Sequence, residues 1–461
     1  MMYDKSVYSA ILLWISCSFF LFLTSPSRKA ILISLLSGWM FLPIFSIQIP
    51  GLPDLDKQTL VVGFISISCL ILGLRGRFQR QNFTFGFLDL PVVLYILAAP
   101  TTALINNSEV YEGISHALAR VFEVGAPYLI GRLYFSRLSE HKLTSKIFLA
   151  FSMIYLPLAI FELRFSPQLH NLVYGYAQHS FAQTIRAGVW RPMVFMRHGL
   201  ELSLWFALAS LIGVWFIRAR IITQGFTIMG IALMLIVTFI GQSYGAIILL
   251  CLGLITLISS NFFKIKLPYF ILFIFPTLYM TNRVADLRIE KPMLEIARTF
   301  LPMRRLRSVS FRLDQEYNLA TRANEKMFFG WGRTGNYRIL EDGKDVTVTD
   351  SRWIIEYCIG GLFGMLPFFI LFFLPVIGLY KIAPASLWHT KNHAPSAALA
   401  IGTAAVLIDL MFNNFCSPIH FLIIGALTYP KLDQEAQRLR RFNITEGEQT
   451  KNWEVSTEAG S

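Results

Sequence analysis

The sequence has little charge for its length. Of its 461 residues, 15% are Asp, Glu, Lys or Arg and 54% are hydrophobic, whereas a water-soluble domain usually carries about 25% charged residues. So few charges cannot cover the surface of a soluble domain of this size. The composition therefore excludes a water-soluble globular enzyme and indicates a protein that lies almost wholly in a membrane.

Cysteine is also scarce, and its placement excludes two kinds of site. None of the five cysteines belongs to a CxxC motif or to a His/Cys group with the spacing of metal ligands; they are Cys17, Cys69, Cys251, Cys358 and Cys416. A disulfide framework and a zinc site are therefore not expected. We expect no metal and no cofactor.

Acidic residues are fewer than basic ones, 28 against 41, which gives a net charge of +13. In a soluble protein this excess would suggest binding to nucleic acid. Here most basic residues lie in short segments between apolar runs, so membrane topology accounts for them, and no nucleic-acid partner is expected.

Long apolar runs are abundant instead. A transmembrane helix needs about 20 mostly apolar residues. Thirteen apolar runs occur, at residues 7–24, 30–48, 59–74, 85–104, 114–134, 146–162, 199–217, 226–240, 244–260, 266–280, 353–379, 396–412 and 418–430. The predicted fold class is all-α, a polytopic transmembrane helix bundle of about 12–13 spans with a large, partly helical periplasmic loop.

Lys and Arg alternate between the connections, and this predicts the orientation. Basic residues fill every second connection: Arg28 and Lys29; Arg75, Arg77 and Arg80; Arg132, Arg137, Lys142 and Lys146; Arg218 and Arg220; Lys264 and Lys266; Lys381 and Lys391; and the tail with Lys431, Arg438, Arg440 and Arg441. Short loops rich in Lys and Arg stay in the cytoplasm. The C-terminus is therefore predicted to be cytoplasmic and, with thirteen spans, the N-terminus lies outside.

This topology divides the chain into six parts. They are N-terminal spans (1–162), a first long periplasmic loop (163–198), central spans (199–280), a large periplasmic loop with an amphipathic helix (281–352), C-terminal spans (353–430) and a cytoplasmic tail that is disordered at its end (431–461).

The large loop is rich in arginine. Apolar residues between Arg304 and Phe329 recur at helical spacing after Pro302, which predicts an amphipathic helix across the mouth of the bundle. Gly330, Gly332 and Gly335 follow. A glycine-rich turn can present backbone N–H groups to an anion, and an ordinary helix end followed by a loop is the alternative.

Three short segments resemble the superfamily of bacterial O-antigen ligases and oligosaccharide repeat-unit polymerases. They are Arg191-Pro192 followed by Phe195-Met196-Arg197-His198-Gly199, then Gly330-Trp331-Gly332, and Asp350-Ser351-Arg352-Trp353 leading into Gly360-Gly361-Leu362-Phe363-Gly364. The resemblance covers residues 150–420. Ligases of this superfamily tend to have a His with Asn or Ser before the glycine-rich span, whereas this chain has Asp350-Ser351, which favours the polymerase branch.

The resemblance implies a metal-independent membrane glycosyltransferase of the bacterial inner membrane. It would transfer a glycan from polyprenyl diphosphate to a sugar hydroxyl at the periplasmic face, building O-antigen, capsule or exopolysaccharide. The implied partners are the lipid-linked oligosaccharide, membrane lipid, and flippase and chain-length regulator proteins. An O-antigen ligase and a lipid-linked oligosaccharide transporter are the alternatives.

Arginine is suited to the diphosphate because its planar guanidinium binds phosphate oxygens in pairs and stays charged. On the predicted outer side the candidates are Arg191, Arg197, Arg312 and Arg333. A role in headgroup contact or in a surface ion pair is the alternative for each.

The candidates for a general base are Asp350, Glu201 and His198. Capping of the helix that contains Trp353 is the alternative role of Asp350. Arg352 and Glu356 are four residues apart, which predicts an ion pair that orients the site. Arg120 and Glu123, at i and i+3, are expected to pair within the membrane.

Overall fold

The computed structural model of the chain describes residues 4–48, 54–75, 83–186, 188–241, 243–288, 303–332 and 335–432. The candidate Arg333 and almost all of the predicted disordered tail lie outside these ranges.

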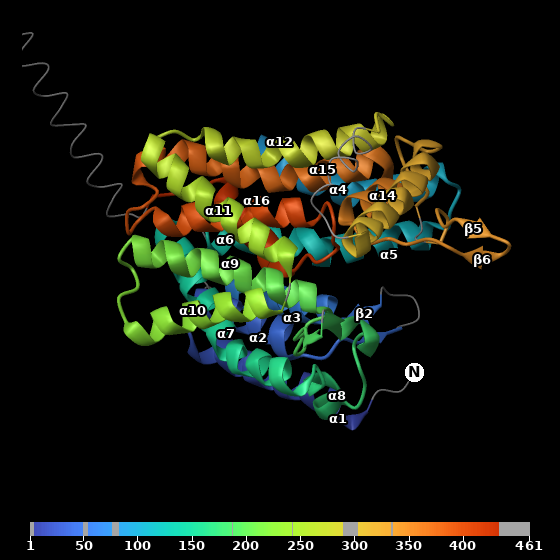
Figure 1. The fold of residues 1–461 in the computed structure, drawn as a ribbon. Helices are drawn as coiled ribbons and strands as arrows, with labels where there is room; N and C mark the ends of the chain where they lie inside the picture. Colours follow the sequence, from blue (N-terminus) through green and yellow to red (C-terminus); the bar gives the residue numbers. More distant parts are fainter. Residues whose placement is uncertain are drawn as a thin grey trace, which may run out of the picture.

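Nearly all regular structure in the described residues is helical (Figure 1). The α-helices are α1 (Lys5–Thr24), α2 (Ser27–Phe41), α3 (Lys57–Leu74), α4 (Leu90–Ile105), α5 (Val110–Arg120), α6 (Ala126–Tyr134), α7 (Leu138–Phe165), α8 (Leu169–Tyr174), α9 (Gly199–Arg218), α10 (Gly225–Ile240), α11 (Tyr244–Phe263), α12 (Leu267–Val284), α14 (Met303–Asn324), α15 (Arg352–Ile382), α16 (Ala394–Asp409) and α17 (Pro418–Thr428). A π-helical segment, η2 (Val121–Gly125), joins α5 to α6.

The remaining elements are short. Three 3-10 turns occur at η1 (Phe87–Asp89), η3 (Phe181–Thr184) and η4 (Ala385–Leu387). Two-residue antiparallel strands pair β1 (Ser46–Ile47) with β2 (Leu55–Asp56), β3 (Ile185–Arg186) with β4 (Val189–Trp190), and β5 (Leu340–Glu341) with β6 (Lys344–Asp345).

The predicted fold class is confirmed: the chain is an all-α polytopic helix bundle. In the described residues, seven helices are long and apolar enough to cross a membrane, and α10, α16 and α17 are shorter apolar helices. Each of the thirteen predicted runs contains helix. The run at 30–48 was predicted too long, because α2 ends at Phe41, just before Pro43, and the chain then turns into β1. Proline disfavours helical backbone in the residue before it.

The helices lie side by side, and their connections gather at two ends of the bundle (Figure 1). At one end, here called the Arg352 end, Asn106 donates to the Gly330 carbonyl at 3.0 Å and Arg352 N–H donates to the Leu410 carbonyl at 3.1 Å. At the opposite end, the Arg28 end, Arg28 pairs with Glu140 at 2.8 Å. The connections that the sequence assigned to one side of the membrane therefore meet at one end.

Helix α14 is the predicted amphipathic helix. Its buried positions Glu316, Leu319, Ala320 and Ala323 follow helical spacing and face α12 and α15. The Glu316 carboxylate accepts hydrogen bonds from the hydroxyls of Tyr279 and Ser351, each at 2.5 Å. Burial raises the pKa of this carboxyl. Polar contact and apolar packing together hold α14 across the Arg352 end.

In the described part of the glycine turn after α14, two N–H groups donate to the backbone of the protein itself and do not face an anion. The N–H groups of Trp331 and Gly332 donate to the carbonyls of Cys358 and Ile359 at 2.8 and 2.9 Å. In return, Leu362 N–H donates to the Met327 carbonyl at 2.8 Å. The backbone of the turn thus fills a break in α15, where Gly361 has φ 58° and ψ −158°.

This backbone contact predicts an effect of two glycine substitutions. A Cβ at Gly361 would lie 2.4 Å from the Phe328 carbonyl carbon, and one at Gly330 would lie 2.5 Å from Gly361 N. Since both residues also have positive φ, Gly361→Ala and Gly330→Ala should each lower the free energy of unfolding by at least about 2 kcal/mol. Thermal unfolding in detergent micelles measures the effect.

Gly335→Ala is the matched control, because a Cβ there meets no atom within 4 Å. A melting temperature of Gly361→Ala equal to that of this control would contradict the backbone contact.

Candidate functional site

A network of buried charges lies at the Arg352 end, where α15 begins. The Arg352 guanidinium pairs with Glu123 at 2.8 Å and with Glu356 at 2.6 Å. It also donates to the Tyr95 hydroxyl at 3.1 Å and to the Asn414 side-chain oxygen at 3.4 Å. The predicted i,i+4 pair is confirmed, and it belongs to a network that joins α4, η2, α15 and the α16–α17 loop.

Arg120 and Glu123 are not paired, contrary to the sequence prediction. Arg120 donates to the Tyr95 carbonyl at 2.7 Å and lies 3.6 Å from the Glu356 carboxylate, while Glu123 pairs with Arg352. The reason is that η2 is π-helical from Val121. The wider π turn rotates Glu123 away from the position that regular α-helical spacing would give it.

A second group of charges lies where α3 and α9 begin. Arg197, Glu201 and Lys57 line one pocket, together with Asp56, Gln58 and Trp39. The buried Lys57 ammonium donates to the carbonyls of Leu42 and Phe195 at 2.7 and 3.3 Å. The Glu201 carboxylate accepts from Arg197 N–H at 3.0 Å, and the Arg197 side chain is exposed. Two of the predicted residues thus share a pocket with a lysine that the sequence reasoning missed.

The predicted base His198 lies beside this pocket. Its Nδ1 accepts from Leu200 N–H at 3.0 Å, so it caps the start of α9. Its ring stacks on Phe415 with centroids 5.5 Å apart. Phe415 follows Asn414, whose side chain accepts from Arg352. The α16–α17 loop therefore contacts both His198 and the Arg352 network.

Arg191 is buried, with 6% of its surface exposed. Its Nε donates to the Gly241 carbonyl at 3.3 Å, which ties the first long loop to the α10–α11 turn. A Cβ at Gly199 would lie 2.4 Å from the Arg191 side chain. The Arg191 side chain and the Gly199 backbone of the first motif therefore pack directly against each other. The diphosphate role of Arg191 stays a prediction.

The structure pairs two predicted residues that were given different roles. Arg312 of α14 forms an ion pair with Asp350 at 3.1 Å, and both side chains are exposed. Helix α15 begins after Ser351, and the Asp350 side chain lies on Arg312, so the capping role considered for Asp350 was wrong. Arg312 and Asp350 lie on the surface and belong neither to the Arg352 network nor to the Lys57 pocket.

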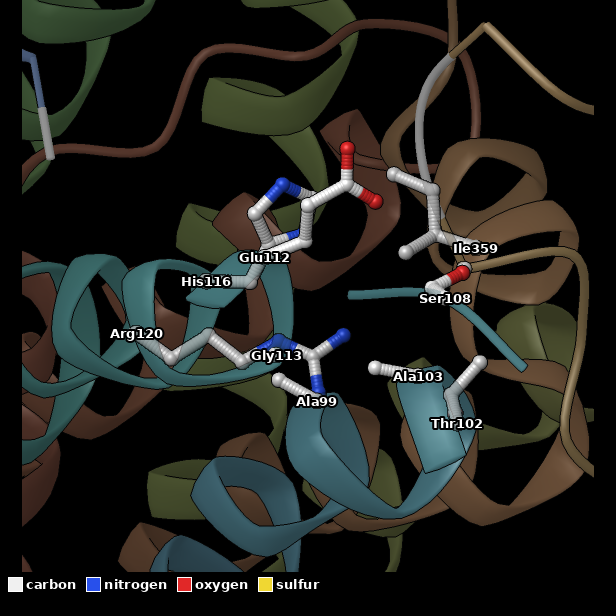
Figure 2. A pocket seen from close by; sticks show the side chains of 10 residues that line it. Ala99, Thr102, Ala103, Ser108, Glu112, Gly113, His116, Arg120 and Ile359 are labelled. Carbon is white, nitrogen blue, oxygen red and sulfur yellow. The ribbon is translucent and has the colours of Figure 1, made fainter. Parts of the chain in front are cut away.

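A further pocket lies between α4, α5 and the glycine turn (Figure 2). From α5 it is lined by Glu112, His116 and Arg120, each four residues after the last, and from α4 by Thr102. The buried Arg120 joins the pocket to the Arg352 network. The sequence reasoning missed these residues, although their spacing places three ionisable side chains on one face of an otherwise apolar run, which in a membrane favours function.

The loop that carries Arg197 is held by residues on neighbouring elements. The buried carboxylate of Glu162 accepts from the N–H groups of Met193 and Val194, each at 2.7 Å. Val194 has φ 56°, a conformation that is rare for a β-branched residue. Tyr155 accepts from Phe195 N–H at 2.8 Å. These contacts fix the backbone directly before Arg197.

At the Arg352 end, cations with fixed positions lie beside carboxylates in partly buried surroundings. Such cations can bind a phosphate group and stabilise the negative charge of a phosphate leaving group. A neighbouring carboxylate can accept a proton from a hydroxyl.

No protein-family model matches the chain, and no curated protein matches it. The fold and the apolar helices define a polytopic helical membrane protein. The resemblance to O-antigen ligases and repeat-unit polymerases stays a prediction.

The two kinds of ion pair predict different effects on stability. Arg352→Ala would remove the closest cation of the buried Glu356 and of the half-buried Glu123, so it should lower the free energy of unfolding by about 3 kcal/mol. Arg312→Ala breaks an exposed pair and should cost about 0–1 kcal/mol. Denaturant unfolding of both variants measures the difference. Equal losses of unfolding free energy in the two variants would contradict a stabilising role for the Arg352 ion pairs.

His170 predicts a dependence on pH. Its Nδ1–H donates to the Tyr176 carbonyl at 2.8 Å and its Nε2 accepts from Ile44 N–H at 3.3 Å. Burial lowers the pKa of His170 from 6.5 to about 4. Between these values the unfolded chain binds a proton that the folded chain does not, so stability should fall as the pH drops from about 6.5 towards 4.

Melting temperatures between pH 7 and pH 4 test this effect. His170→Asn should remove this part of the pH dependence, whereas the half-buried His179, substituted in the same way, is the control. An unchanged profile in His170→Asn would rule out His170 as the cause.

Proposed function

We propose that the chain is a membrane glycosyltransferase that lengthens a polysaccharide. It takes a glycan from polyprenyl diphosphate and transfers it to a sugar hydroxyl at the Arg352 end. The product is an O-antigen, capsule or exopolysaccharide chain, and the enzyme is a repeat-unit polymerase.

The observation that carries this proposal is the pocket of Lys57, Arg197 and Glu201 at the end of a membrane bundle. Asp56 also lines the pocket, but its exposed charged side chain is Arg197, which together with Lys57 suits a diphosphate. The pocket begins where α3 begins, and α3 exposes apolar side chains along its length, including Ile67 and Leu70 at 59% and 62%. A prenyl chain can lie on such a surface while its headgroup is held by the pocket.

The bond changes follow from this placement. The acceptor oxygen bonds to the anomeric carbon, the bond from that carbon to the diphosphate oxygen breaks, and the hydroxyl proton passes to a base. Arg197 and Lys57 hold the departing polyprenyl diphosphate. Of the three candidate bases, Glu201 lines the same pocket as these cations, so we assign the proton to its carboxylate.

Orientation is part of the proposal. The chain lies in the bacterial inner membrane with its C-terminus in the cytoplasm and the Arg352 end outside. The support is the distribution of charge: the connections at the Arg28 end carry the basic residues that the positive-inside rule places in the cytoplasm.

The transporter alternative gains no support from the broken helix. Transporters bind substrate at helices that are interrupted within the membrane, and α15 is interrupted at Gly361. Here, however, the backbone of the glycine turn occupies the break through its hydrogen bonds to Cys358 and Ile359. The break is therefore already filled by the chain itself.

The test uses purified protein in lipid nanodiscs with lipid-linked repeat units and no nucleotide sugar. We expect the saccharide to lengthen. Arg197→Ala should slow lengthening by roughly 10²–10³-fold, as loss of one charge-stabilising donor does, and Glu201→Gln by about 10²–10⁴-fold. Gel analysis of the labelled glycan gives the rates.

Arg164→Ala is the matched control, because Arg164 is exposed and lies in the last turn of α7, at the Arg352 end. It should lengthen the glycan at the normal rate. Normal lengthening by Arg197→Ala would reject the role of this pocket, and transfer to a lipid A core instead of to a second repeat unit would identify a ligase.

A further inference from the structure

We infer that the pocket between α4 and α5 binds hydroxyl groups of the acceptor saccharide. The inference rests on the proposed function, because it names the site of the second substrate. It concerns the residues of Figure 2, which are separate from the Lys57 pocket.

The rim and the floor of this pocket differ in burial. Glu112 and His116 are half-buried and form the rim. Arg120 and Thr102 are buried, so the Arg120 guanidinium lies at the floor of the pocket. Small residues form the walls, namely Ala99, Ala103, Gly113 and Gly332. Small walls let a ligand approach the helix backbones closely.

The mixture of charges in the lining selects the kind of ligand. Glu112 would repel a phosphate or carboxylate, and Arg120 would repel an amine. A sugar hydroxyl suits both because it donates to the carboxylate and accepts from the guanidinium or the imidazole. A few placed polar groups on a mostly apolar wall are typical of sites that orient a neutral ligand.

Thr102 supplies an independent observation. Its side chain is 2% exposed and lines the pocket, and its hydroxyl has no hydrogen-bond partner. A buried hydroxyl without a partner costs free energy. A ligand hydroxyl in the pocket would satisfy it. The neighbouring Thr101 differs, since its hydroxyl donates to the Leu97 carbonyl at 2.8 Å.

The position of the pocket fits a second substrate. Arg120 connects it to Glu356 and thus to the Arg352 network, and η2 of that network packs against α3, the helix that begins with Lys57. The two pockets therefore belong to elements that contact η2. They differ in the charge that is most exposed: in the Lys57 pocket it is Arg197, which suits a diphosphate, whereas the half-buried rim of the other pocket carries Glu112 and His116.

The experiment is saturation-transfer NMR on the full chain in nanodiscs, with no lipid-linked donor. The probes are the methyl glycosides of glucose, galactose and N-acetylglucosamine, and inorganic pyrophosphate is added as a competitor. We expect transfer to at least one glycoside that pyrophosphate does not displace. Thr102→Val and Glu112→Gln should each raise its Kd roughly five- to tenfold.

Thr101→Val is the matched control and should leave the Kd unchanged. Because Thr102→Val removes a hydroxyl that has no partner, its melting temperature should stay at or above that of the unsubstituted chain, so a weaker Kd cannot be a folding defect. Equal Kd values for Thr102→Val and Thr101→Val, no transfer to any of the glycosides, or displacement by pyrophosphate would each overturn the inference.

The lengthening assay separates this outcome from failure of the proposed function. If the unsubstituted chain lengthens lipid-linked repeat units but binds none of the glycosides, the pocket assignment is wrong and the activity stands. If a glycoside binds in a Thr102-dependent way but nothing is lengthened, the pocket is a saccharide site and the proposed activity is wrong.

Discussion

The ion pairs of Arg352 hold the Arg352 end of the bundle together. One guanidinium, 13% exposed, contacts carboxylates from η2 and from its own helix and reaches the α16–α17 loop. A charge at this depth is stable only while its partners stay in place. The positions of α5, of α15 and of the loop beside His198 therefore depend on one another.

A second constraint comes from the backbone and not from charge. The glycine turn after α14 forms hydrogen bonds with both sides of the break in α15, so this turn enters the bundle while α14 lies across its end. Unpaired backbone groups are costly away from water, and here each side of the break supplies the partners of the other. This explains how an arginine-rich loop is held against apolar helices.

Much of the fold could be predicted from the sequence, because apolar runs of sufficient length leave few alternatives to helices in a membrane. The Arg352–Glu356 pair was predicted because it depends only on local spacing. Lys57 and Thr102 were missed because their significance lies in neighbours from distant helices. His116 was missed although its spacing from Glu112 and Arg120 can be read from the sequence. Arg120 and Glu123 were paired wrongly because a π turn changes the spacing. The partners of the glycine turn were not predicted because Cys358 and Ile359 lie on another helix, α15.

The central claim is that the Arg352 end, with its two pockets, faces the periplasm. Single cysteines at Gly343, in the β5–β6 turn, and at Lys391, near the start of α16, can be placed in a chain without its five native cysteines. With intact bacterial inner membranes and a membrane-impermeant thiol reagent added from the periplasmic side, the account predicts labelling at 343 and protection at 391. Labelling at 391 with protection at 343 would contradict it.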